Sequence, residues 1–466
     1  MADQGVFQGL VLIRLNTYKL DHGKEGTCLK TCLLLLPRPV FPVVSGYSLK
    51  NYSLVRILSA RYRLTVGVIT QGTVSEEERA YYRSLGIRWF VYRIPKLKSY
   101  MNTLLGIFSD RPLQVSYYYD RGLQRKVDEE AEKADVLIAA LIRTRAYLDP
   151  WKAGSAVSGN GKTVVFDMVD SIAMNYARSA ASTASFFWRM IYRIEEKRLA
   201  RYEARWIRES SVTYLFNPEE QKALRKYGRV ICLPHGVNDR LFTYEEETRT
   251  EKERPDPALP PHSVVFMGKM DYQPNVDAVL WYLKNVHAKL GGRVPFAIVG
   301  AYPAEEVRNA AAQYPDVTVT GFVEDPYMYA SQAMAMVAPM QSGGGIQNKV
   351  LEGMALGKVN IVSSLAAAAL EGVVPGKELL IADRPEQYAE ILTDMCPWAD
   401  KKSAAVSGTA EECKTESGKA EDGKAEDGKA ERYDSICLNA REYIRSRYTW
   451  DKYGEGYIEG IEDDDR

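Results

Sequence analysis

Short apolar runs alternate with amphipathic stretches along most of this chain. In the first half, the runs that predict strands cover residues 31–36, 64–69, 87–92, 136–140, 163–167, 212–216 and 230–233. In the second half, they cover residues 263–267, 296–299, 317–320, 335–338, 359–362 and 379–381. The stretches between them have helical spacing, among them 49–60, 120–134, 185–209, 276–290 and 304–313. Strands that alternate with helices are typical of parallel sheets covered on both faces, so the sequence predicts two doubly wound α/β domains.

Three segments interrupt this alternation and indicate the domain borders. Residues 1–27 show little core signal and are interpreted as an N-terminal extension. Residues 243–261 are acidic and contain four prolines, which places a border close by. Residues 399–432 contain a repeat of Gly-Lys-Ala-Glu-Asp without an apolar face, which predicts a disordered insertion. We therefore expect a first domain at residues 28–240 and a second at residues 241–446.

A run of three glycines followed by a predicted helix carries the clearest chemical signal. The glycines are Gly343, Gly344 and Gly345, and the helix has Lys349 in its first turn and Glu352 one turn further along the same face. A helix start already carries about half a positive charge, so a lysine there is unfavourable by roughly 0.3–1 kcal/mol unless an anion meets it. Glycines let a phosphate approach the backbone, and a carboxylate can accept hydrogen bonds from hydroxyls. The pattern favours a nucleotide diphosphate with a sugar or ribose attached, and an ordinary glycine turn before a surface helix is the alternative.

The composition narrows the class of protein. The chain has 466 residues, 46% of them hydrophobic, which suffices for two sizeable cores. No apolar run reaches about 18 residues, and Met1 to Gln8 lacks the pattern of a signal peptide, so we expect a cytoplasmic protein. The six cysteines form no CxxC pair and the four histidines no cluster, so no metal site is predicted.

Charge is distributed unevenly along the chain. Residues 1–240 contain 37 Lys and Arg against 23 Asp and Glu, and the remainder carries an equal acidic excess, because the whole chain has 61 of each. Basic and aromatic residues are mixed at 88–98 and 186–208. This mixture suits an anionic membrane surface or single-stranded nucleic acid, and it also occurs on solvated helix faces. We expect the membrane surface rather than nucleic acid as a partner, and the solvated face stays open.

Three further motifs lie at residues 266–278, Gly321–Asp325 and Gly345–Glu352. Together they resemble the opening strand and loop, the base-binding turn and the sugar-nucleotide helix of GT-B glycosyltransferases of family 4. The pairing of the first and third is similar to bacterial exopolysaccharide transferases associated with exosortase systems. The resemblance covers roughly residues 31–398 and 433–459. It implies two Rossmann-like domains that face each other across a cleft, with a C-terminal helix at 447–466 that completes the first, acceptor-binding domain.

The resemblance also implies roles for individual residues on the donor side. Glu352 would bind the ribose hydroxyls, and Lys269 and Lys349 would contact the diphosphate. The backbone at Phe322 and Val323 would hold the base.

Three glycines relate to this family pattern in different ways. Gly268 precedes Lys269 in the opening loop of the nucleotide-binding domain. Gly344 stands where the family often has a glutamate that touches the donor sugar, so the donor sugar is not identified. Gly46 stands alone where the family has two adjacent glycines on the acceptor side.

The sequence offers three candidates for the catalytic chemistry. Asp167 and Asp170 follow an apolar strand at its carboxyl end, where an acidic residue could orient or deprotonate an acceptor hydroxyl. The alternative for Asp170 is that it caps the next helix together with Ser171. His235 lies in the turn between the domains and either reaches the cleft or is structural. The helix start, the amides of the glycine loop and Lys349 could stabilise the leaving diphosphate without a metal.

These inferences predict a glycosyltransferase of the hexosyl type that needs no metal or other cofactor. By resemblance it would retain the anomeric configuration and move a sugar from a nucleotide-diphosphate sugar to a hydroxyl of a glycan or lipid-linked acceptor. Its expected place is polysaccharide biosynthesis at the inner face of the membrane. A dehydrogenase is disfavoured because Val299 to Ala304 breaks the GxGxxG pattern. A GT-B sugar-nucleotide epimerase and a non-catalytic nucleotide- or glycan-binding protein remain alternatives.

Overall fold

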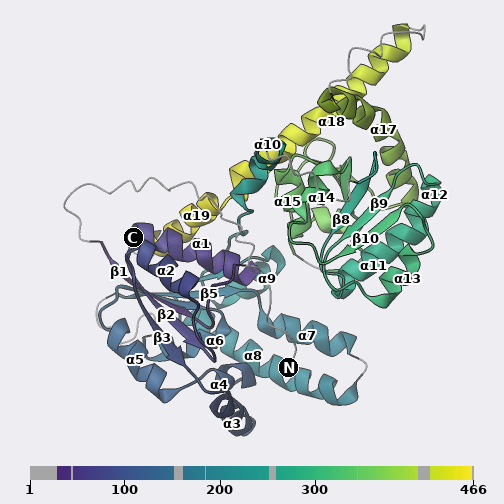
Figure 1. Cartoon of the computed structure of the whole chain (residues 1–466). Coiled ribbons are helices and arrows are strands. Elements are labelled where there is room, and N and C mark those ends of the chain that lie inside the picture. The colour runs from purple at the N-terminus through teal and green to yellow at the C-terminus, as the bar shows by residue number, and fades with distance from the viewer. Residues whose placement is uncertain are drawn as a thin grey trace.

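The computed structural model describes residues 29–43, 46–151, 161–183, 185–250, 259–343, 345–407 and 420–463. It contains two domains, each built around one parallel sheet with helices packed on it (Figure 1). The first sheet has seven strands and the second has six. The predicted pair of doubly wound α/β domains is therefore confirmed.

The first sheet has β1 near its centre. Its strands are β1 (Thr31–Leu36), β2 (Arg63–Thr70), β3 (Arg88–Arg93), β4 (Val136–Ala140), β5 (Thr163–Val169), β6 (Val212–Leu215) and β7 (Val230–Cys232). They run parallel in the order β3-β2-β1-β4-β5-β6-β7. The order reverses between β1 and β4, and sheets of this kind bind ligands at the carboxyl ends of the strands beside such a reversal.

Helices cover both faces of this sheet. They are α1 (Gly46–Arg61), α2 (Glu76–Ser84), α3 (Lys96–Gly106), α4 (Leu113–Tyr117), α5 (Arg121–Ala131), α6 (Ile142–Arg145), η1 (Ala146–Trp151), α7 (Ile172–Ser182), α8 (Phe186–Arg208) and α9 (Pro218–Leu224). Successive residues of β1 point to opposite layers. Cys32 and Leu34 pack in the cluster that includes α1 and α2, whereas Leu33 and Leu35 pack in the cluster that includes α5 and η1. This burial on both faces explains the continuous apolar run of β1.

The second sheet repeats the design. Its strands are β8 (Val264–Met267), β9 (Phe296–Val299), β10 (Val317–Gly321), β11 (Ala335–Ala338), β12 (Val359–Val362) and β13 (Leu380–Ile381), in the order β10-β9-β8-β11-β12-β13. Its helices are α10 (Tyr244–Thr250), α11 (Gln273–Tyr282), α12 (Ala288–Leu290), α13 (Glu305–Ala311), α14 (Tyr327–Gln332), α15 (Asn348–Ala355), α16 (Ser364–Ala367), α17 (Pro385–Ser407) and α18 (Ala420–Arg447). Here the strand order reverses between β8 and β11, so the loops after these two strands lie at the expected ligand edge.

The chain crosses between the domains twice, and the two crossings lie side by side. The first follows β7, and the second links α18 to α19 (Trp450–Glu462). The amide of Val237 donates to the carbonyl of Tyr448 over 2.8 Å. A Cβ placed on Gly236 would lie 2.4 Å from the amide nitrogen of Trp450. After the second crossing, α19 packs on the first domain beside α1 (Figure 1).

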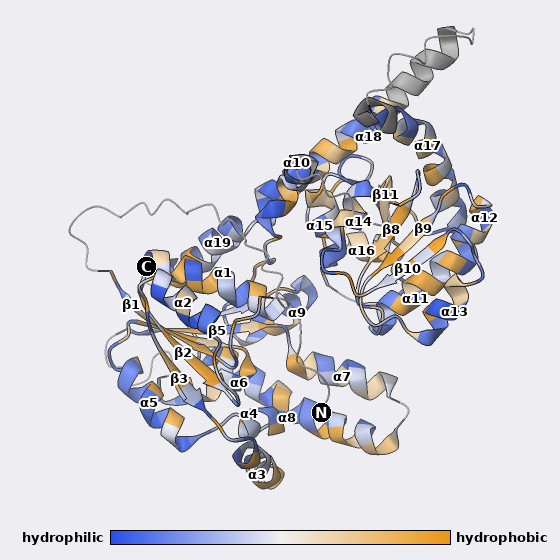
Figure 2. Cartoon of the chain, viewed as in Figure 1, coloured by the Kyte–Doolittle hydropathy of each residue, from blue (hydrophilic) through white to orange (hydrophobic). Residues whose placement is uncertain are grey.

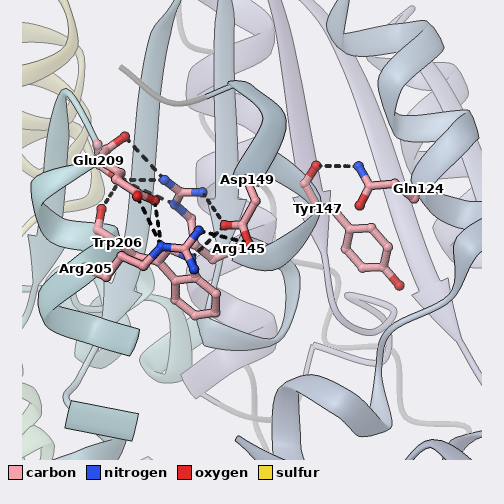
Figure 3. Close-up of polar contacts among 8 residues, drawn as sticks. Gln124, Arg145, Tyr147, Asp149, Arg205, Trp206 and Glu209 are labelled. Carbon is pink, nitrogen blue, oxygen red and sulfur yellow. Dashed lines mark hydrogen bonds and ion pairs between the residues drawn. The ribbon is translucent and has the colours of Figure 1, made fainter. Parts of the chain in front are cut away.

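A buried arginine anchors α8 in the first domain (Figure 3). Arg145 is fully buried and lies 3.7 Å from the carboxylate of Asp149, and its guanidinium also donates to the carbonyl of Glu209 at 3.3 Å. The indole of Trp206 donates to Asp149 at 2.7 Å. Burial lowers the pKa of Arg145 to about 10, while Asp149 and Glu209 raise it. These contacts fix the turn after β4 against the C-terminal half of α8.

The helices α17 and α18 extend into the segment 399–432. The first runs to Ser407 and the second begins at Ala420, whereas residues 408–419, like the predicted extension 1–27, lie outside the described residues. The structure therefore differs from the predicted disorder at both ends of the segment. Both helices continue from residues that pack in the core of the second domain, Trp398 of α17 and Tyr433 of α18. The repeat itself contains Ala, Lys and Glu, which favour a helix, but also Gly and Asp, which do not. Within the described residues, none of the helices is both long and apolar enough to cross a membrane.

Candidate functional site

The loops that follow β8, β10 and β11 form the second-domain side of the site. The loop after β11 leads through Gly343 and Gly345 into α15. Both glycines have positive φ angles, 97° and 84°, which other residues adopt only at an energetic cost. A Cβ on Gly343 would lie 3.3 Å from Pro274, so this loop packs on the start of α11. Gly344 lies outside the described residues, and its role stays a prediction.

Lys349 is a buried cation with neutral groups in direct contact. Its side chain emerges from the first turn of α15, and the residue is only 8% exposed. The ammonium donates to Asn275 Oδ1 at 2.7 Å, lies 3.4 Å from Met340 Sδ and sits 4.4 Å from the ring centroid of Phe266. Burial lowers the pKa of Lys349 to about 8, while the negative charge of Glu352 raises it. A bound anion next to the Lys349 ammonium would neutralise its positive charge, which the neutral groups around it stabilise only in part.

Asn275 connects Lys349 to the loop after β8. Its amide nitrogen donates to the carbonyl of Lys269 at 2.9 Å, and a Cβ on Gly268 would lie 2.6 Å from the same nitrogen. Because Gly268 has no side chain, the amide of Asn275 can approach the backbone and donate to the carbonyl of Lys269. The side chain of Lys269 is 61% exposed, pairs with Asp271 at 3.1 Å and lies 5.1 Å from the ring of Tyr302. Lys269 is therefore at the surface of the same edge, less restrained than Lys349.

Glu352 is tied to the loop after β10. It accepts a hydrogen bond from the hydroxyl of Tyr327, and burial raises the pKa of Glu352, while this bond and Lys349 lower it. The amide of Tyr327 in turn donates to Asp325 Oδ1 at 2.9 Å. In the same loop, Phe322 is 67% exposed and Val323 packs against the core. The structure thus brings the predicted base turn and the predicted ribose carboxylate to one place.

Asp170 lies at the carboxyl end of β5, directly before α7. Its Oδ2 accepts a hydrogen bond from Asn175 at 2.6 Å. Burial raises the pKa of Asp170, whereas the bond from Asn175 and the charges of Arg178 and Arg143 lower it. Ser171 caps α7, since its hydroxyl accepts from an amide of that helix at 3.2 Å. The capping alternative for Asp170 is therefore wrong, and its carboxylate is held by side chains instead.

Asp167 does not reach the site. It is fully buried within β5, where its carboxylate pairs with Lys50 of α1 and accepts a hydrogen bond from the hydroxyl of Tyr457 of α19 at 3.3 Å. Burial lowers the pKa of Lys50, and Asp167 raises it. A carboxylate enclosed in this way contacts no substrate, so the prediction that Asp167 is catalytic is corrected: it ties three elements of the first domain together.

His235 and Asn217 bring the first domain into contact with α15. His235 Nε2 lies 2.8 Å from Oδ1 of Asn348, the first residue of α15. A Cβ on Gly345 would lie 3.6 Å from Nδ2 of Asn217, which follows β6. The carboxyl edges of the two sheets therefore meet at the glycine loop. Since β6 pairs with β5, this junction also lies next to the strand end that carries Asp170.

Gly46 takes a different position from the other predicted glycines. It begins α1 after the loop that follows β1, and it is exposed with no atom within 4 Å of a Cβ built on it. This loop borders the reversal of strand order in the first sheet, on the acceptor side that the sequence predicted.

The structure adds residues to this edge that sequence reasoning missed. Leu141 after β4 and Val169 at the end of β5 have φ angles of 63° and 69°, a strained conformation for branched residues. They precede Arg143, which lies 5.1 Å from the ring of Tyr118, and Asp170. No sequence signal marks these two residues, because leucine and valine are not expected at positive φ.

The comparisons with known proteins agree with this geometry. Residues 261–396 match the family model described as glycosyl transferases group 1. The comparison with curated proteins gave no match.

Several solved structures share the fold over nearly the whole chain. HepE of Anabaena, solved in complex with UDP, has a TM-score of 0.57 at 14% identity and aligns over 93% of this chain and 100% of its own. Sucrose-phosphate synthase from Thermosynechococcus elongatus has a TM-score of 0.53 at 13% identity, covering 92% of this chain and 98% of its own. An α,α-trehalose 6-phosphate synthase from Burkholderia multivorans reaches 0.54 at 11% identity, covering 94% and 97%. The chain thus has the GT-B fold predicted from its sequence.

Proposed function

We propose that the protein is a glycosyltransferase that takes a sugar from a nucleotide-diphosphate sugar. The acceptor is a hydroxyl of a glycan or of a lipid-linked intermediate in polysaccharide biosynthesis, at the inner face of the membrane. One observation carries the proposal: the incompletely compensated cation Lys349 lies beside the glycine loop, at the junction where both sheets present their carboxyl edges. The family match of residues 261–396 and the solved HepE complex with UDP support it.

The donor would lie with its diphosphate at the start of α15. As the bond between the sugar C1 and the β-phosphate oxygen breaks, negative charge grows on the phosphate. Lys349 and the amides of the glycine loop then stabilise the transition state more than the ground state. Glu352 would accept hydrogen bonds from the ribose hydroxyls, and Phe322 and Val323 would flank the base. This scheme requires no metal. By resemblance the sugar keeps its anomeric configuration, which in a single displacement requires the hydroxyl to attack C1 from the face that the diphosphate leaves.

The acceptor would approach from the first domain. Asp170 would orient the attacking hydroxyl or accept its proton while the new bond to C1 forms. The raised pKa of Asp170 favours such proton exchange. His235 would hold the first residue of α15, and it is therefore a positioning residue rather than a group that touches the substrates.

A thermal-shift screen against UDP-, GDP- and ADP-sugars tests the donor class. We expect one nucleotide to raise the melting temperature by several degrees, and Lys349→Met to abolish this rise, with Lys284→Met, an exposed position on α11–α12, as the matched control. Release of an epimerised sugar nucleotide without an acceptor would identify the epimerase alternative. Absence of any shift in the whole panel would contradict the proposal.

A further inference from the structure

The helix α3 turns an apolar face to the solvent. Apolar residues recur along it at the i, i+3, i+4 and i+7 spacing of one helix face. In a globular protein such a face is normally buried, yet here these side chains are 48–91% exposed: Leu97, Tyr100, Met101, Leu104, Leu105, Ile107 and Phe108. Residues 96–108 contain Lys96 and Lys98 and no acidic residue. The face is therefore apolar with a basic border.

The first half of α8 has the same character. Its exposed large side chains are Phe186, Phe187, Trp188, Met190 and Ile194, at 47–79% exposure. Arg189, Arg193 and Lys197 follow one another at i,i+4 spacing beside them. Basic and apolar side chains together line an open groove of about 200 Å³. Neither Arg193 nor Lys197 has an ion pair within the part of the chain that the structure describes.

The two helices belong to one surface. Arg198 of α8 donates to the carbonyl of Ile107, at the end of α3, over 2.9 Å. Glu195 of α8 accepts from the amide of Leu113 at 2.7 Å. Figure 2 shows apolar residues on α3, at the end of the first domain remote from the second, and along the end of the α7–α8 hairpin, which projects from the same domain. We call the exposed apolar and basic side chains of residues 96–108 and 186–197 the docking surface.

We propose that the docking surface binds an anionic lipid bilayer in its interface. Apolar side chains would enter the boundary between headgroups and acyl chains, while the lysines and arginines would contact anionic headgroups. Charge decides against a second copy of the chain as the occupant. A symmetric dimer would bring Arg189, Arg193 and Lys197 of both copies together against one partly exposed carboxylate per copy on this stretch, Glu196, so most of these cations would be desolvated without a counterion.

The docking surface also has a suitable position for a membrane-held acceptor, a point that rests on the proposed function. The helix α7 begins two residues after Asp170 and ends four residues before Phe186. Its 11 residues span roughly 16 Å at about 1.5 Å per residue. An acceptor anchored in the bilayer would therefore reach Asp170 if its reacting hydroxyl extended about this distance from its anchor.

Vesicle co-sedimentation of the full chain tests the inference without any donor or acceptor. We expect binding to phosphatidylcholine vesicles that contain roughly 30% of the anionic lipid phosphatidylglycerol. Binding to phosphatidylcholine alone, or to the anionic vesicles at high salt, should be at least about fivefold weaker. Leu105→Glu should weaken binding about tenfold. Leu438→Glu on α18 is the matched control, because the two leucines are 69% and 67% exposed, and it should change binding less than about twofold.

The basic part of the surface has its own matched pair. Lys197→Gln should weaken binding to the anionic vesicles about fivefold, whereas Lys284→Gln, exposed on the second domain, should not. Equal binding of Leu105→Glu and Leu438→Glu would overturn the proposal. So would a dimer in light scattering that Leu105→Glu converts to a monomer, since a second copy would then be the occupant. Because the assay contains no sugar nucleotide, its outcome is independent of the thermal-shift screen.

Discussion

The carboxyl edges of the two sheets have the same topology but differ in their charged groups: the second combines the buried cation Lys349 with the carboxylate Glu352, whereas the first presents the carboxylate Asp170. At the second edge, Lys349 is buried against Asn275, Met340 and an aromatic ring, and its pKa is lowered to about 8. At the first edge, burial raises the pKa of Asp170, and it raises the pKa of Glu203 to about 7; Glu203 lies on α8 and accepts hydrogen bonds from the hydroxyl of Ser171 and the amide of Ala173.

The difference shows how one fold serves two partners of a reaction. A buried cation favours binding of an anion, because the anion replaces the stabilisation that solvating water gives the ammonium in the unfolded chain. A carboxylate with a raised pKa is a stronger proton acceptor than an ordinary carboxylate. We therefore assign the leaving group to the second edge and the attacking hydroxyl to the first, and the following predictions test this division.

The largest effect is expected from Asp170→Asn. The change preserves shape but removes the proton acceptor, so the transfer rate should fall by about 10²–10⁴-fold, while donor affinity stays within about twofold. Steady-state kinetics and calorimetry of nucleotide binding separate the two quantities. Asp170→Glu, which keeps the carboxylate, should restore part of the rate. An equal loss of donor affinity in Asp170→Asn would place Asp170 on the donor side and break the comparison.

Lys349→Met should have the converse signature. Donor affinity should fall about 100-fold, since a charge-assisted contact to phosphate is lost. The unliganded protein should nevertheless become more stable at pH 7 by about 1–3 kcal/mol, because a buried charge is removed. Chemical denaturation without ligand and nucleotide titration measure both. Loss of stability in this variant would show that the cation is structural.

The pH dependence of nucleotide binding sharpens the same point. The folded pKa of Lys349 is lowered from 10.5 to about 8, so the ammonium loses its proton as pH rises through about 8. The affinity for the nucleotide found in the screen should therefore fall by up to about tenfold between pH 7 and 9.5. Stability without ligand should rise over the window between about 8 and 10.5, where the unfolded chain still binds this proton. Lys349→Arg should remove both dependences.

The smallest effect is expected at the junction of the edges. His235→Ala removes the contact to Asn348, and its effect should be a decrease in kcat of about three- to tenfold at unchanged donor affinity. His235→Gln, which can still donate to Asn348, should recover most of the rate. A higher rate in His235→Gln than in His235→Ala would separate positioning by the hydrogen bond from general packing.

The sequence predicted the architecture because that architecture is local in origin. The strands 136–140, 296–299, 335–338 and 359–362 were predicted with the bounds that the structure has, since each is a short apolar run between amphipathic stretches. The disorder predicted for 399–432 differs from the helices at its two ends, which extend from the packed residues Trp398 and Tyr433.

The surroundings of the candidate residues could not be predicted in the same way. Lys349 and Asn275 are 74 residues apart, and only the packing of the loops after β8 and β11 brings them into contact. Asp167 and Asp170 look alike in the sequence, but the alternation of β5 and its positive-φ end bury the first and turn the second toward α7. The apolar face of α3 lies mostly after the basic and aromatic stretch 88–98, so that stretch indicated only the first turn of the helix.

The paired crossings between the domains have a mechanical consequence. A single connecting segment would let the two domains rotate about three axes. Two adjacent segments, joined by the hydrogen bond from Val237 to Tyr448, oppose twisting more than bending. We therefore expect relative movement of the domains to be mainly opening and closing about that line, which would keep the glycine loop and Asp170 aligned. Cutting the chain after residue 447 would free the lobes to twist, even though both sheets would remain whole.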